Sequence, residues 1–206
     1  MGSRGGRRGV CLCAIALIAV VCAPARAWAD CSQGTRPTTL LERTFQVETL
    51  RALKAAMPVA PDGWRVVEET EIRPPRLACI GQEREPLPFE YRIRFAKPDS
   101  ATSEITVRVN ARREVMPASP EAMEFAPAAL AFRAREGVAG AVQVLFGDWS
   151  LGSGDGPAPG EALAHFTTDV PYTRAQSLAV RIDGDRPRVD QLLARLNMTA
   201  LASLVR

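Results

Sequence analysis

Histidine and lysine are scarce in this 206-residue chain, and the motifs of the common hydrolases and metal sites are absent. His165 is the only histidine, and the sequence contains no Gly-x-Ser-x-Gly, His-Glu-x-x-His or Cys-x-x-Cys motif. A general base needs a nucleophile and an orienting acid, and the spacing around His165 identifies neither. The sequence therefore favours a non-enzymatic role over an enzyme, and it predicts neither a metal site nor a cofactor.

The N-terminal segment has the layout of a secretory signal peptide. Three arginines precede an apolar run at Val10–Ala23, and no acidic residue occurs before Asp30. The run has about 14 residues, whereas a membrane-spanning helix needs about 20. Small residues at alternating positions favour cleavage after Ala29, with cleavage after Ala27 as the alternative.

Cleavage at this point changes the charge of the chain. The full sequence has 26 basic and 23 acidic residues, but four of the basic residues lie in the predicted signal peptide at 1–29. The single domain predicted at 30–206 therefore has 22 basic and 23 acidic residues, a formal charge of −1. A nucleic-acid partner calls for a clustered basic excess, so none is expected. We predict a periplasmic or secreted protein with no stable membrane insertion after cleavage.

Cysteine is also rare, and only Cys31 and Cys79 of the five cysteines follow the predicted signal peptide. Two cysteines in an oxidising compartment allow one intramolecular pairing, so a Cys31–Cys79 disulfide is predicted. It would close a loop of about 49 residues, which the chain-entropy model credits with about 4 kcal/mol of stability. Lipidation of Cys31 is disfavoured, because Asp30 stands where a lipid-anchored protein has a small residue.

The spacing of apolar residues predicts groups of strands between helices. Helical periodicity indicates a helix at Thr38–Met57, and helical composition with an N-capping serine indicates another at Ser119–Gly137. A closing helix is predicted to begin near Asp185, with a break at Asn197. Strands are predicted at Trp64–Ile72, Phe89–Phe95, Glu104–Ala111, Ala141–Gly147, Ala162–Val170 and Ser177–Asp183.

These elements predict one α+β domain with the order α-βββ-α-βββ-α. Short links between strands favour antiparallel pairing, so we expect an antiparallel sheet of about six strands with helices packed on it. The expected core consists of apolar residues from most of these elements: Trp64, Tyr91, Ile93, Val107, Val109, Phe146, Val180, Ile182, Leu192 and Leu196.

The register of the central hairpin follows from its charges and its turn. Placing Arg92 or Arg94 opposite Arg108 would bring like charges together, which is unfavourable. Pairing Arg94 with Glu104 avoids this, sets Glu90 opposite Arg108 and matches the apolar residues of the two strands. It also leaves a short link with a proline at its start, a common hairpin geometry.

The candidate binding residues are three arginines on the wet face of this hairpin: Arg92, Arg94 and Arg108. Clustered guanidinium groups bind carboxylate or phosphate through paired hydrogen bonds. In the predicted register Arg92 has no directly opposed acid, which makes it the best candidate for an anion contact. The alternative is that Glu90 and Glu104 neutralise the arginines.

The sequence thus predicts an exported, non-enzymatic accessory or interaction protein with an unknown protein partner. The alternative is a module that binds a small anionic ligand or a glycan fragment through the arginine-bearing face. The glycine-rich stretch Gly152–Gly160 does not indicate a nucleotide site, because no lysine follows it and the next predicted element is a strand. It is interpreted as a hairpin link.

The disulfide prediction is tested by titrating thiols in the denatured, unreduced mature protein, which should contain none. Cys79→Ser should then lower the free energy of unfolding by about 2–4 kcal/mol, because the unfolded chain regains the entropy of the open loop. Two titratable thiols would contradict the bond.

Overall fold

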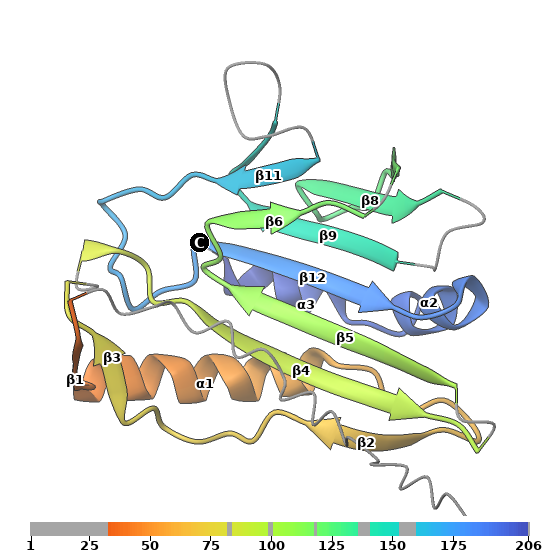
Figure 1. Cartoon of the computed structure of the whole chain (residues 1–206), viewed down its shortest axis with the longest axis horizontal. Helices are drawn as coiled ribbons and strands as arrows, with labels where there is room; N and C mark the ends of the chain where they lie inside the picture. The colour runs from red at the N-terminus through yellow and green to blue at the C-terminus, as the bar shows by residue number, and fades with distance from the viewer. Residues whose placement is uncertain are drawn as a thin grey trace, which may run out of the picture.

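A seven-stranded antiparallel sheet lies at the centre of the structure (Figure 1). The computed structural model describes residues 33–81, 84–98, 101–117, 119–135, 141–152 and 160–205, so the predicted signal peptide and Cys31 lie outside the described residues. In spatial order the strands are β2 (Arg65–Glu69), β4 (Phe89–Ala96), β5 (Thr102–Val109), β12 (Ser177–Asp183), β9 (Ala141–Gly147), β8 (Leu130–Ala134) and β7 (Pro120–Ala122). The predicted α+β class with an antiparallel sheet is confirmed.

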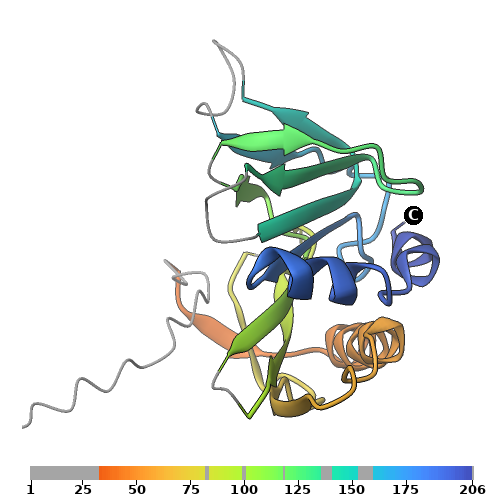
Figure 2. The same cartoon turned by 90° about the vertical axis from the view of Figure 1, so that its right-hand side faces the viewer.

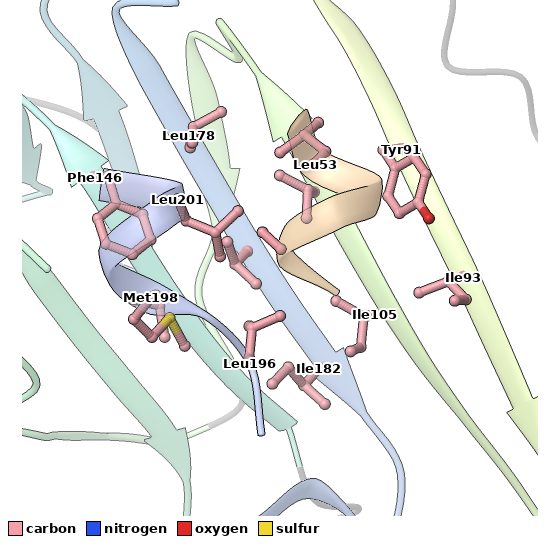
Figure 3. Packing of buried hydrophobic residues seen from close by; sticks show 14 of the residues in the cluster. Leu53, Tyr91, Ile93, Ile105, Phe146, Leu178, Ile182, Leu196, Met198 and Leu201 are labelled. Atoms are coloured by element: carbon pink, nitrogen blue, oxygen red, sulfur yellow. The ribbon is translucent and has the colours of Figure 1, made fainter. Parts of the chain in front are cut away.

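Helices pack on one face of this sheet (Figure 2): α1 (Leu40–Ala56), α2 (Arg186–Leu193) and α3 (Met198–Leu204). Alternate side chains of the central strands point towards them and form the main core (Figure 3). Of the predicted core residues, Trp64 is partly buried and the others are buried. Within the described residues, no helix has the length and hydropathy needed to cross a membrane.

A capping box and an ion pair fix the start of α1. The Thr39 hydroxyl accepts a hydrogen bond from the Glu42 N–H, and the Glu42 carboxylate accepts one from the Thr39 N–H. Arg36 donates two further hydrogen bonds to this carboxylate, at 2.6 and 2.9 Å. These bonds lower the pKa of Glu42 below its ordinary value, although burial of the side chain opposes them. The helix predicted at Thr38–Met57 is therefore present.

A three-stranded sheet packs on the opposite face of the main sheet, in the order β10 (Trp149–Leu151), β11 (Glu161–Ala164) and β6 (Arg113–Val115). We call it the small sheet. It contacts the main sheet through a second apolar cluster: Met116, Phe132, Leu145, Trp149, Ala162, Ala164 and Ala179. The small sheet therefore covers β8, β9 and part of β12, and it leaves β4 and β5 uncovered.

A two-stranded sheet lies beside the start of α1, formed by β1 (Thr35–Pro37) and β3 (Leu77–Cys79). It places Cys79 opposite Thr35, four positions along the chain from Cys31. The Cys31–Cys79 disulfide itself stays a prediction.

The β4–β5 hairpin has the predicted register. Arg94 lies opposite Glu104, and Glu90 lies opposite Arg108. On the core side Ile93 lies opposite Ile105. The result is a strand pair with one apolar face and one charged face.

The helix predicted at Ser119–Gly137 is wrong. The described part of this segment forms β7 and β8, and Ser119 has a φ of 48°, which is not helical. β8 pairs with β9 and is buried on both faces, with Ala131 in the main core and Phe132 in the second cluster. A strand buried on both faces shows no alternation, and its apolar run resembles that of a helix.

Two other predictions need smaller corrections. The strand predicted at Ala162–Val170 ends at Ala164, opposite the first residue of its partner β10, and one further hydrogen bond joins the His165 N–H to the Asp148 carbonyl. The closing helix is divided into α2 and α3, and the predicted break at Asn197 is confirmed. The Asn197 side chain caps α3 by accepting a hydrogen bond from the Ala200 N–H.

Asn110 joins three segments at the end of β5. It is buried and has a φ of 54°, a left-handed conformation that asparagine tolerates better than most residues. Its Nδ2 donates to the carbonyls of Leu87 and Arg174 at 3.1 and 2.9 Å, and its Oδ1 accepts from the Gln176 N–H at 2.7 Å. The segments that lead into β4 and β12 are therefore bonded to one side chain.

Asn110→Ala is expected to lower the free energy of unfolding by about 2–4 kcal/mol, because buried backbone groups lose their partners and alanine disfavours this φ. Asn110→Gly should lose about 1 kcal/mol less, because glycine adopts positive φ without strain. Urea unfolding measures both, with Asn197→Ala as the control for loss of an exposed cap, worth about 1 kcal/mol. An Asn110→Ala loss no larger than that of the control would contradict this role.

Candidate functional site

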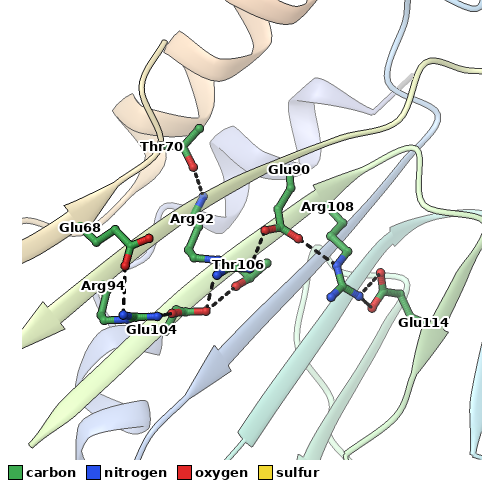
Figure 4. Close-up of polar contacts among 9 residues, drawn as sticks. All are labelled: Glu68, Thr70, Glu90, Arg92, Arg94, Glu104, Thr106, Arg108 and Glu114. Carbon is green, nitrogen blue, oxygen red and sulfur yellow. Dashed lines mark hydrogen bonds and ion pairs between the residues drawn. The ribbon is translucent and has the colours of Figure 1, made fainter. Parts of the chain in front are cut away.

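The half of the main sheet that the small sheet leaves uncovered is charged (Figure 4). Alternate residues of β2, β4, β5 and β12 point away from the core here. Their arginine side chains are between 27% and 42% exposed. We call this surface the arginine–glutamate face: Glu68, Glu90, Arg92, Arg94, Glu104, Thr106, Arg108, Arg181 and Asp183.

Arg94 is held by carboxylates from both neighbouring strands. Its Nη2 lies 2.8 Å from Glu104 Oε2 on β5, and its Nη1 lies 3.0 Å from Glu68 Oε2 on β2. The hydrogen bonds that Arg94 donates to Glu104 raise the pKa of Arg94 above its ordinary value, with the nearby charges of Glu104 and Glu68 adding to the effect. Arg94 therefore bridges the edge strand to the hairpin.

Arg92 lies between two carboxylates, although Thr106 is directly opposite as predicted. Its Nη2 lies 2.9 Å from Glu90 Oε1, and its Nε lies 3.4 Å from Glu104 Oε1. Thr106 in turn donates to Glu104 at 3.2 Å. An anion at Arg92 would have to compete with two ion pairs, which agrees with the alternative that Glu90 and Glu104 neutralise the arginines.

Arg108 connects the face to the small sheet. Its Nε donates to Glu90 on β4 at 3.2 Å, and its Nη1 lies 3.0 and 3.2 Å from the two carboxylate oxygens of Glu114 on β6. The Glu114 side chain is only 3% exposed and also accepts a hydrogen bond from Gln143 Nε2 on β9 at 3.1 Å. One buried carboxylate thus links three strands across two sheets.

Burial raises the pKa of Glu114 above the ordinary glutamate value, although the positive charge and hydrogen bonds of Arg108 oppose this. Arg181 opposes it as well, whereas Glu90 adds to it. Gln143 Oε1 is buried and has no hydrogen-bond partner among the described residues. Because a protonated Glu114 becomes a donor, this oxygen offers an acceptor for it if the amide rotates.

Arg181 is a member of the face that the sequence analysis did not select. It lies opposite Thr106 on one side and Gln143 on the other. Its Nε donates to both oxygens of Asp183, at 3.0 and 2.8 Å, and its two terminal nitrogens have no partner among the described residues. The sequence indicates that Arg181 is on the polar face of its strand, because it alternates with apolar residues such as Val180 and Ile182. The sequence does not indicate which strands lie on either side of it.

The single histidine lies away from this face. His165 Nε2 is 2.8 Å from Ser150 Oγ on the exposed surface of the small sheet. No carboxylate contacts the histidine ring among the described residues, so the pair lacks the orienting acid of a catalytic triad. The described residues also contain no cluster of His, Cys, Asp or Glu placed to bind a metal ion.

Comparison with known proteins finds no matching family model, no matching curated protein and no matching solved structure. The function of this chain is therefore inferred from its sequence and from the geometry of the site.

Glu114→Gln tests the raised pKa. Because the folded protein holds the Glu114 proton more tightly than the unfolded chain does, the stability contributed by this side chain is lost as the pH rises through the folded-state pKa. Glutamine cannot ionise, so the unfolding free energy of the wild type minus that of Glu114→Gln should fall from about pH 4.3 upward. Urea unfolding across this range measures it, and a constant or rising difference would contradict the prediction.

Proposed function

We propose that this chain is an exported, non-enzymatic interaction protein that binds its partner on the arginine–glutamate face. The observation that carries the proposal is the division of one sheet surface into two halves. Over β8 and β9 most outward side chains are apolar, with Gln143 as a polar exception, and the small sheet covers them. Over β4 and β5 they are charged and partly exposed.

The ion pairs support binding because they fix the side chains before a partner arrives. Arg92, Arg94 and Arg108 each contact two carboxylates. Immobilising a long side chain on binding costs about 0.5–1.5 kcal/mol, and side chains that are already held avoid most of that cost. Arginine is also enriched among the residues that dominate binding energies. Alternating charges favour a partner whose charges are of opposite sign at each position, and they disfavour an apolar partner.

Export is part of the proposal because of the N-terminal sequence. A basic start, a short apolar run and small residues near Ala29 are typical of a cleaved signal peptide. The pair of cysteines that follows suits an oxidising compartment.

The second candidate function is binding of a small anionic ligand. Arg181 supports it, because its terminal nitrogens have no partner among the described residues, and a guanidinium edge of this kind binds carboxylate or phosphate through paired hydrogen bonds. The anion site would then be centred on Arg181 and not on Arg92.

Site-specific photocrosslinking in cells that export the protein tests the interaction. A photoreactive residue in place of Glu68, whose side chain is 49% exposed at the margin of the face, should form discrete covalent products. The same residue in place of Arg51, exposed on α1, is the control and should form none. Arg181→Gln should reduce the Glu68 products about tenfold, because hydrogen bonds to charged groups contribute about 1.5–3 kcal/mol.

Equal products from both positions, or none from Glu68, would contradict the interaction. A thermal-shift screen against anionic metabolites and cell-wall fragments tests the second candidate. A shift that Arg181→Gln abolishes and Arg51→Gln preserves would favour the small anionic ligand over the protein partner.

A further inference from the structure

Strand β6 has one edge that is not paired with any strand in the described part of the chain, and this edge is called its free edge. It pairs with β11 on one side, where the Met116 N–H donates to the Gly160 carbonyl at 2.8 Å and the Ala164 N–H donates to the Arg112 carbonyl at 2.9 Å. Hydrogen-bonding directions alternate along a strand, so Arg113 and Val115 direct their N–H and C=O groups to the other side. No described strand pairs with that side.

This free edge faces the arginine–glutamate face. Glu114 reaches Arg108 on β5 and Gln143 on β9, and these two strands lie on either side of β12 in the main sheet. β6 therefore lies over β9 and the neighbouring part of β12, with β11 on the side away from β5 and its unpaired edge on the side towards β5 (Figure 1). The uncovered surface of β5 and β4 continues from beneath this edge (Figure 4).

At the corner between edge and face, hydrogen-bond donors of two kinds have no partner among the residues that the structure describes. The backbone N–H groups of Arg113 and Val115 are on the edge. The terminal nitrogens of Arg181 are on the face below, and Arg108 is at the diagonal position on β5, opposite Ala179. A partner that satisfies both sets carries backbone carbonyls and a carboxylate.

We propose that the corner binds an extended peptide segment, which adds to β6 as a fourth strand of the small sheet and turns an acidic side chain towards Arg181. This inference rests on the proposed function and names the partner's chemistry. Strand addition of this kind takes its affinity from main-chain hydrogen bonds and its specificity from alternate side chains. On the outer face of the added strand, apolar residues would cover Val115, which is 65% exposed.

The two edges of the main sheet are less suitable. β2 carries a bulge between Val66 and Glu68, and its glutamates are already in ion pairs. β7 begins with Pro120, which has no N–H to donate. Bulges, prolines and charges are devices by which natural sheets block added strands. β6 contains neither a bulge nor a proline.

The test uses the mature protein and a short capped peptide with a central glutamate, flanking valines and threonine elsewhere. Hydrogen exchange should slow at the amides of Arg113 and Val115 when the peptide binds, because those N–H groups gain acceptors. Val115→Pro removes one edge donor without touching the ladder to β11 and should weaken binding about tenfold. Leu151→Pro, at the free edge of β10, is the matched control and should bind like the wild type.

Two comparisons complete the test. The wild-type protein should bind a peptide with a central lysine about tenfold more weakly than the glutamate peptide, because the charge-assisted contact is lost. The Arg181→Gln variant should bind the glutamate peptide about tenfold more weakly than the wild type for the same reason. Thermal unfolding of both proline variants shows whether they fold. Absence of slowed exchange at Arg113 and Val115 with saturating peptide would overturn the inference. If the Val115→Pro variant still crosslinks at Glu68, the inference about β6 is also overturned, whereas the proposed binding on the arginine–glutamate face is retained.

Discussion

The register between β4 and β5 is the constraint on which the rest of the structure depends. Each strand alternates strictly, so this pairing sends Tyr91, Ile93 and their neighbours to one side and the charged residues to the other. β12 continues the same division, with Val180 opposite Val107 and Arg181 opposite Thr106. A shift by one residue would exchange the two faces, burying arginine beneath the helices. The core and the candidate site are therefore two results of one pairing.

The sequence was sufficient where a pattern repeats over many residues. Eight-residue strands with charges of both signs leave one favourable register, and α1 shows both a helical period and a capping box. It was insufficient where the pattern is short or hidden. β6 and β10 have three residues each, too few to show a period, and β8 is apolar on both faces. The small sheet, and with it the corner beside β6, could not be predicted for this reason.

The site was predicted in the same uneven way. Arg92, Arg94 and Arg108 follow from alternation along the hairpin, and the structure brings them together on one face. Their partners Glu68 and Glu114 come from strands whose neighbours depend on tertiary packing. The sequence predicted Arg92 to be available for an anion, because no acidic residue is directly opposite it. In the structure its long side chain reaches Glu90 and Glu104 at other positions of the two strands. Arg181 was overlooked because nothing in the sequence places β12 beside β5.

The contact between Glu114 and Arg108 has a consequence for how the molecule opens. The small sheet is attached by a modest apolar cluster and by the ion pair between Arg108 and the buried Glu114, so it is a natural unit for sub-global unfolding below the global free energy. Lifting it would break the pair and free Arg108 from its buried carboxylate. Any molecule that requires β6 and Arg108 in their folded positions binds only the closed form, and mass action then suppresses the opening. Occupancy of the face and cohesion of the two sheets are thereby thermodynamically linked, and each strengthens the other.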